Sequence, residues 1–175
     1  LKGRLSEYPL IVVPEWAYLE SAFRDDLVAY AKKGGSLLLV GPKSAALFQP
    51  ELGVTLEGEP SSKPQTLAYK GAQAQTKGFA QGVRLGAGVE TLGTLQADGR
   101  AAAQPAASIA PLGKGKIAAV YAELGQSYNG VRSPVVRGFL NDLARRLFPK
   151  PMVEVAGTSD VDVCLMRKEG RLLVN

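Results

Sequence analysis

The stretch GGSLLLVGPKSAALF, residues 34–48, has the pattern of a strand followed by a helix. A double glycine leads into the apolar run Ser36–Val40, which is followed by the turn Gly41–Pro42 and by a second apolar segment. A short continuous apolar run between turn residues is typical of a buried strand. Proline suits the first position of a helix because its missing N–H needs no partner there. The stretch therefore predicts a strand that turns sharply into a helix.

The residues before this stretch predict a βαβ unit. Leu10–Val13 is a continuous apolar run ended by Pro14, a pattern typical of a strand buried on both faces. In the segment 21–33, apolar residues recur at helical spacing, and Gly34 suits the left-handed end of a helix. A strand, a helix and a strand joined by short connections indicate two parallel strands with a right-handed crossover.

The later part of the chain predicts a hairpin and one strong helix. The apolar runs 106–111 and 116–122 flank Gly113–Gly115, which makes a hairpin turn. Further on, Ser133 is a natural N-cap and Pro134 a natural first residue of a helix with one apolar face.

The middle and the end of the chain have weaker patterns. Residues 52–104 are rich in Gly, Ala, Gln and Thr and indicate a β-rich insertion, and 161–166 with 171–174 indicate a C-terminal hairpin. We therefore expect an α/β domain over residues 1–150, followed over 151–175 by the truncated start of a C-terminal β-domain. The fold class expected is a three-layer flavodoxin-like domain with a mostly parallel sheet.

Charge and composition point away from nucleic acid and membrane. The net charge of +5 arises from 21 basic and 16 acidic residues. The basic residues are scattered, and aromatic residues do not interleave with them as single-stranded nucleic acid binding requires. No stretch approaches the ~20 apolar residues of a membrane span, and no signal-peptide pattern is present. We expect a soluble chain without nucleic acid or membrane partners, in a compartment that the sequence leaves open.

The counts of histidine and cysteine limit the chemistry. The chain has no histidine and a single cysteine, Cys164. A Ser-His-Asp or Cys-His triad therefore cannot be assembled from this chain, and the commonest metal ligand is missing. Cys164 lies in an apolar run, where a thiol is expected to act as a small core residue. We expect no catalytic residue, no metal site and no cofactor.

The stretch YPLIVVPEWAYLESAFRDDLVAYAKKGGSLLLVG, residues 8–41, resembles the class I glutamine amidotransferase-like superfamily. It looks most like the trimerisation-type domain that follows the barrel in β-galactosidases of glycoside hydrolase family 42 and related enzymes. The stretch PLGKGKIAAVYAELGQSY, residues 111–128, resembles a Gly-Lys-Gly hairpin and strand of such domains. The final VDVCLMRKEGRLLVN is similar to the opening of the C-terminal β-domain in those glycosidases.

The resemblance implies a fold without its usual activity. In amidotransferase-like enzymes the elbow after this strand carries a nucleophilic cysteine, at a position that falls near Gly41, and the histidine falls near Gln126. Neither residue can do that chemistry, and fold alone does not carry function. The resemblance implies a non-catalytic accessory or oligomerisation domain of a larger carbohydrate-active hydrolase. Its partners would be other domains of the parent polypeptide or further copies of the chain.

The alternative is a module that binds a sugar or an anion. In open parallel sheets, ligand crevices form outside the carboxyl ends of the strands. Seven residues are the candidates for such a crevice: Glu15, Trp16, Gly41, Lys43, Glu123, Gln126 and Tyr128. A simpler interpretation is that Trp16 packs against a helix or a neighbouring domain and Glu15 is solvated.

Phosphate binding and glycoside hydrolysis are two more specific but less supported alternatives. Gly41–Ser44 resembles the end of a phosphate loop, but the first glycine of that motif is missing and Pro42 removes a donor. Glu15 and Glu123 are a candidate carboxylate pair for glycoside hydrolysis in a stand-alone hydrolase, although nothing in the sequence sets their separation.

Overall fold

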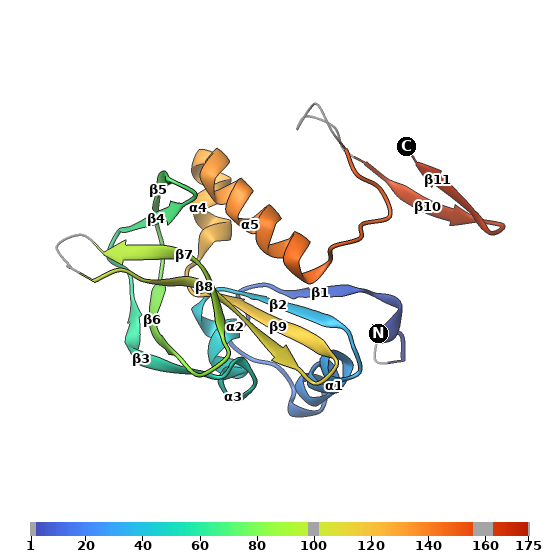
Figure 1. Ribbon diagram of the computed structural model, residues 1–175, viewed down its shortest axis with the longest axis horizontal. Coiled ribbons are helices and arrows are strands. Elements are labelled where there is room, and N and C mark those ends of the chain that lie inside the picture. The colour runs from blue at the N-terminus through green and yellow to red at the C-terminus, as the bar shows by residue number, and fades with distance from the viewer. Residues whose placement is uncertain (1–2, 98–101, 156–162, 175) are drawn as a thin grey trace.

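The computed structural model describes residues 3–97, 102–155 and 163–174 (Figure 1). Its helices and strands are η1 (Leu5–Glu7), β1 (Leu10–Val13), α1 (Ser21–Lys32), β2 (Ser36–Val40), α2 (Pro42–Leu47), α3 (Gln49–Leu52), β3 (Val54–Ser61), β4 (Gln65–Tyr69), β5 (Ala72–Thr76), β6 (Ala80–Leu85), β7 (Glu90–Ala97), β8 (Gln104–Leu112), β9 (Gly115–Val120), α4 (Leu124–Val131), α5 (Pro134–Leu147), β10 (Leu165–Lys168) and β11 (Arg171–Val174).

The β1–α1–β2 unit forms as the sequence predicts. Strands β1 and β2 are parallel, with Leu10 opposite Ser36. Helix α1 ends in its last turn with Lys32, which suits the helix dipole, and Gly34 follows at φ 121°, a conformation that other residues rarely adopt. The turn from β2 into α2 also matches the expectation, because Gly41 is the N-cap and Pro42 the first helical residue.

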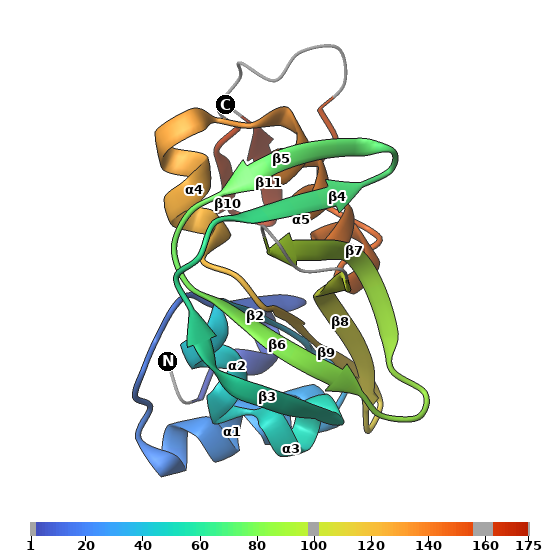
Figure 2. The ribbon, with the colours of Figure 1, turned by 90° about the vertical axis from the view of Figure 1, so that its left-hand side faces the viewer.

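The expected three-layer flavodoxin-like fold with a mostly parallel sheet is wrong. The main sheet has seven strands in the order β1-β2-β9-β8-β7-β4-β5, and it is mixed and curled (Figures 1 and 2). Only the β1/β2 and β2/β9 pairs are parallel, whereas the next four pairs are antiparallel. The reason is that the middle segment is not simply an insertion: its strands β4, β5 and β7 extend the main sheet, while β3 and β6 form a separate ribbon.

The hairpin and the long helix predicted in the later part of the chain are both present. Strands β8 and β9 are antiparallel and turn at Gly113, whose φ of 63° suits glycine. Helix α5 begins at Pro134, and the Ser133 side chain accepts a hydrogen bond from the N–H of Val136 at 3.5 Å. Local capping chemistry therefore positions this helix as the sequence indicates.

Two apolar cores lie on opposite faces of the central strands. Leu37 and Leu39 belong to the core beneath α1, α2 and α3, whereas Leu38 between them belongs to the core beneath α5. Strand β9 alternates in the same way, with Ile117 in the first core and Ala118 in the second. This alternation places both strands at the buried centre of the sheet.

Strand β1 departs from the expectation that it is buried on both faces. It is an edge strand, paired only with β2, and Val12 is 50% exposed. A continuous apolar run predicts a central strand because such runs are common there. The partner strand that would cover β1 is absent from the described part of the chain.

The C-terminal strands β10 and β11 form an antiparallel hairpin that extends away from the α/β body (Figure 1). Cys164 precedes β10 and is exposed, so the expectation of a core cysteine is wrong. The hairpin provides no second layer to bury this thiol. Among the described residues, no helix has the length and apolar character needed to cross a membrane.

Candidate functional site at the strand ends

The carboxyl ends of β1, β2 and β9 bring three of the predicted residues together. Glu15 follows β1, Gly41 follows β2 and Glu123 follows β9. The Gly41 N–H donates to the carbonyl of Val120 at 2.9 Å, which ties the elbow to the end of β9. The Lys43 N–H donates to Glu15 Oε1 at 3.1 Å, which ties the elbow to the end of β1.

Glu15 fills the space that a side chain at position 41 would need. A Cβ built on Gly41 would lie 1.1 Å from Glu15 Oε2, and Gly41 has a φ of 99°. The Glu15 carboxylate also accepts the N–H of Lys43 in the first turn of α2. The protein's own carboxylate therefore takes the place in which the phosphate-loop hypothesis put an external anion.

The second carboxylate oxygen of Glu15 is buried, which is unusual for an atom without a hydrogen-bond partner. Among the described side chains, Glu15 Oε2 is buried without a hydrogen-bond partner. Burial is the main cause that raises the pKa of Glu15, and the negative charge of Glu123 raises it further. The Lys43 N–H and the Lys43 charge oppose this shift. The protonated carboxyl is therefore favoured at this point more than in solvent.

Ser44 holds the end of β1 to α2, a role that the sequence does not predict. The Trp16 N–H donates to Ser44 Oγ at 2.9 Å, and Ser44 Oγ donates to the Pro14 carbonyl at 2.7 Å. Ser44 is fully buried. The phosphate-loop resemblance includes this serine, but nothing local in the sequence indicates a partner 28 residues away.

Glu123 anchors the segment between β5 and β6. The Phe79 N–H donates to Glu123 Oε2 at 3.0 Å, and the Glu123 N–H donates to the Phe79 carbonyl at 3.0 Å. Ser127 Oγ adds a second tie, accepting from the Lys77 N–H at 2.7 Å and donating to the Lys77 carbonyl at 2.8 Å. The start of α4 is thus fastened to residues 77–79 through side-chain and main-chain bonds.

The remaining predicted residues are divided between different surroundings. Trp16 is 49% exposed and lines an apolar hollow along β1. Tyr128 is half-buried against the core beneath α5. Gln126 is exposed and lines a hollow of about 490 Å³ between β5 and α4, together with Gln73, Gln75 and Lys77. The structure therefore brings Glu15, Gly41, Lys43 and Glu123 together, whereas Trp16, Gln126 and Tyr128 lie in three other surroundings.

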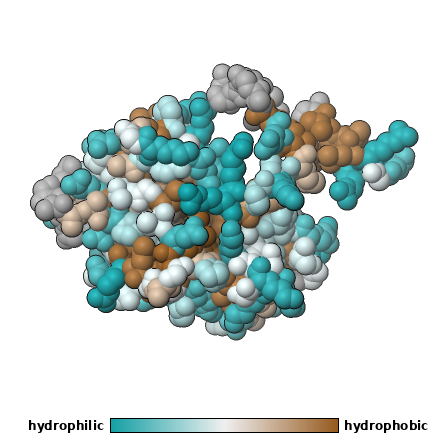
Figure 3. All heavy atoms as spheres, in the orientation of Figure 1, coloured by the Kyte–Doolittle hydropathy of each residue, from teal (hydrophilic) through white to brown (hydrophobic). Residues whose placement is uncertain are grey.

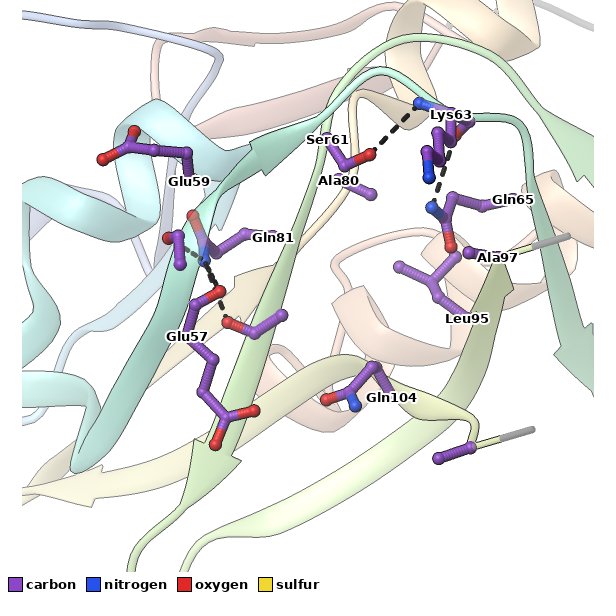
Figure 4. A pocket seen from close by; sticks show the side chains of 13 residues that line it. Glu57, Glu59, Ser61, Lys63, Gln65, Ala80, Gln81, Leu95, Ala97 and Gln104 are labelled. Carbon is purple, nitrogen blue, oxygen red and sulfur yellow. Dashed lines mark hydrogen bonds between the residues drawn. The ribbon is translucent and has the colours of Figure 1, made fainter. Parts of the chain in front are cut away.

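A separate hollow of about 260 Å³ lies between the β3–β6 ribbon and the end of β7 (Figure 4). Gln81 is buried there, and its Nε2 donates to three main-chain carbonyls, those of Glu57, Gly58 and Gly82, at 3.0–3.1 Å. The Gln81 side-chain amide therefore stabilises the β3–β6 ribbon. Among the described residues, no group of three or more acidic or cysteine side chains is placed to hold a metal ion.

The fold of this chain is similar to part of several solved glycoside hydrolase structures. Gan42B, a GH42 β-galactosidase from G. stearothermophilus, matches 96% of this chain at a TM-score of 0.72 and 17% identity. The β-galactosidase from Bacillus circulans sp. alkalophilus matches 97% of it at 0.68 and 12% identity. The chain spans about a quarter of the length of these two enzymes (26% and 27%).

A similar fold makes up most of another protein. Cytoplasmic Protein STM3548 from Salmonella typhimurium matches 84% of this chain at a TM-score of 0.65 and 13% identity, and 74% of that protein is covered. No protein-family model matches the sequence, and no curated protein sequence matches it either. The comparisons therefore establish a shared fold, and they do not confirm the resemblance to the glutamine amidotransferase-like superfamily.

Proposed function

We propose that this chain is a non-catalytic accessory domain of a larger glycoside hydrolase. The observation that carries the proposal is the likeness to GH42 β-galactosidases, which extends over nearly all of this chain but only about a quarter of theirs. A segment with its own two-faced core can serve as one domain of such a polypeptide. Its work would be to pack against other domains or to associate copies of the enzyme.

The geometry at the strand ends supports a structural role for both candidate carboxylates. Glu15 Oε1 accepts the Lys43 N–H, and Glu15 Oε2 is buried. Glu123 Oε2 accepts the Phe79 N–H. A nucleophile or general acid must reach the glycosidic bond, whereas Glu15 Oε1 and Glu123 Oε2 accept hydrogen bonds from the protein's own main chain.

The test is an assay of the 175-residue chain with aryl β-galactosides and other aryl glycosides. We expect no hydrolysis above the buffer rate, and the same result for Glu15→Gln and Glu123→Gln. Turnover that falls away in either variant would instead support carboxylate chemistry and contradict the proposal.

A second candidate function, sugar or anion binding, rests on the hollow between β5 and α4. Its lining combines the amides of Gln73, Gln75 and Gln126 with the ammonium of Lys77, groups that bind hydroxyls and anions. Titration with galactose and with inorganic phosphate, followed by calorimetry, tests it. Binding that is lost in Gln126→Ala but kept in Gln49→Ala would favour this function.

A further inference from the structure

The hollow between the β3–β6 ribbon and the end of β7 combines an apolar wall with polar side chains (Figure 4). Ala80 and Leu95, which are buried, contribute alkyl groups to the wall. Its volume of about 260 Å³ is at the small end of the range for ligand pockets, so it suits one small molecule. Polar and apolar side chains are interspersed over the visible face of the α/β body in Figure 3, so exposed apolar groups alone do not mark a binding site there.

The hollow is distinguished by two buried glutamine side chains that each keep one oxygen atom free. Gln65 is 8% exposed and Gln81 is 4% exposed. The Gln65 Nε2 donates to the carbonyl of Lys63 at 3.3 Å, and the Gln81 Nε2 donates to main-chain carbonyls of the ribbon. Neither Oε1 accepts a hydrogen bond from a described residue, and neither is fully enclosed. Because buried amide oxygens normally have a donor, these two call for one from a molecule in the hollow.

Glu57 and Gln104 add further hydrogen-bonding groups to the lining. Glu57 extends from β3 and Gln104 from the start of β8, and the two side chains point toward one another in Figure 4. Within the described part of the chain, neither side chain has a hydrogen-bond or ion-pair partner. A carboxylate accepts bonds from two neighbouring hydroxyls, and an amide both donates and accepts. The hollow is therefore richest in acceptors and fits a molecule that presents several donors.

The charges around the hollow balance each other. The carboxylate of Glu57 lies on one side of it, and the ammonium of Lys63 lies beside Gln65 on the other (Figure 4). Glu59 also contributes to the lining, but its carboxylate extends away from Gln65 and Gln104 in Figure 4. A small ion of either sign would meet one like charge here, whereas a neutral molecule would not. The arrangement favours a neutral ligand.

We infer that this hollow binds a single neutral sugar ring. Such a ring has hydroxyl donors along its edge and an apolar face of C–H groups. The hydroxyls would donate to the free oxygens of Gln65, Gln81 and Glu57, and the C–H face would contact Leu95. The site is separate from the carboxylates at the strand ends and from the hollow between β5 and α4. It goes beyond the proposed function, because packing against other domains requires no bound sugar.

A titration followed by nuclear magnetic resonance tests the inference on the isotope-labelled 175-residue chain. The probes are D-glucose, D-galactose and D-mannose. We expect at least one of them to shift the side-chain amide signals of Gln65, Gln81 and Gln104, with a Kd in the millimolar range that is usual for so small a ligand. The absence of shifts at tens of millimolar sugar, or shifts confined to other residues, would overturn the inference.

Matched variants locate the sugar. Glu57→Gln and Gln104→Ala should each weaken binding, Glu57→Gln by about tenfold or more because it replaces a charged acceptor. Glu59→Gln makes the same exchange on a side chain that extends away, and it should leave the affinity unchanged. Gln126→Ala, in the hollow between β5 and α4, should also leave it unchanged. Unchanged affinity in Gln104→Ala, or a loss in Gln126→Ala alone, overturns the inference; unchanged spectra away from the hollow verify that each variant is folded.

Charged probes test the class of ligand, and the hydrolysis assay keeps the proposed function separate. Methylammonium or inorganic phosphate that shifts the same amides more tightly than any sugar would overturn the neutral-sugar assignment. Sugar binding without hydrolysis supports both the inference and the accessory role. Hydrolysis lost in Glu15→Gln or Glu123→Gln contradicts only the accessory role, whereas absent binding together with absent hydrolysis overturns only the sugar site.

Discussion

The carboxylate of Glu15 stands in the place of a side chain at Gly41: Oε2 lies 1.1 Å from where a Cβ on residue 41 would be. Substitution at this elbow should therefore be costly. Gly41→Ala must adopt a φ of 99° that favours glycine, and it displaces the Glu15 carboxylate from the Lys43 N–H, so we expect the free energy of unfolding to fall by about 1–3 kcal/mol. Urea denaturation measures it.

The control for this elbow is Gly125→Ala in α4, where an added Cβ meets nothing within 4 Å and helix propensity improves. That variant should be neutral or slightly stabilising. In Glu15→Ala/Gly41→Ala the clash is removed, so the double variant should lose less than the sum of the two single losses. Strict additivity would show that the two residues do not share this space.

The buried carboxyl of Glu15 should make stability depend on pH. Because its folded-state pKa is raised, the folded protein binds this proton more tightly than the unfolded chain. The contribution is fully present below the unfolded pKa and is lost as pH rises through the raised folded pKa. Glu15→Gln keeps the acceptor for the Lys43 N–H, so its unfolding free energy should vary less over that pH range than that of the unaltered chain. The exposed Glu59→Gln, which makes the same exchange away from this site, is the control.

Ser44 should be important for stability because its hydroxyl serves two main-chain groups. Ser44→Ala leaves the Trp16 N–H and the Pro14 carbonyl without this partner, and we expect a loss of about 1–3 kcal/mol. Hydrogen exchange should show faster exchange of the Trp16 amide in the variant. The exposed Ser6→Ala is the control; an equal loss there would contradict the assignment.

Tyr121 and Ser108 should behave as a coupled pair. Their hydroxyl oxygens are 2.5 Å apart, both side chains are fully buried, and burial raises the pKa of Tyr121 to about 12. Tyr121→Phe or Ser108→Ala leaves one buried hydroxyl without its hydrogen-bond partner, and each should lower the free energy of unfolding by about 1–3 kcal/mol. The double variant should lower it by less than the sum of the two single losses. Thermal unfolding with the exposed Tyr18→Phe as control measures this. Additive losses would rule out a shared hydrogen bond.

The sequence predicts correctly those helices, strands and turns that depend on neighbouring residues along the chain. The apolar run of β2, the capped start of α5 at Ser133 and the turn at Gly113 each use local rules of propensity and capping. The sequence also indicates where the strands end, so it places three of the seven candidate residues, Glu15, Gly41 and Glu123, just after strands.

The tertiary structure decided what depends on distant partners. Strands β4, β5 and β7 carry weak patterns, and they join the sheet because pairing with β8 and with one another gives them hydrogen bonds and burial. Likewise, β1 has the composition of a central strand, but it became an edge because no strand was available beyond it among the described residues. The sequence alone determines the local helices, strands and turns, and its lack of histidine excludes a His-based catalytic triad. The order of the strands in the sheet and the pairing of buried polar groups follow only from the folded chain, because those energies arise between residues far apart in the sequence.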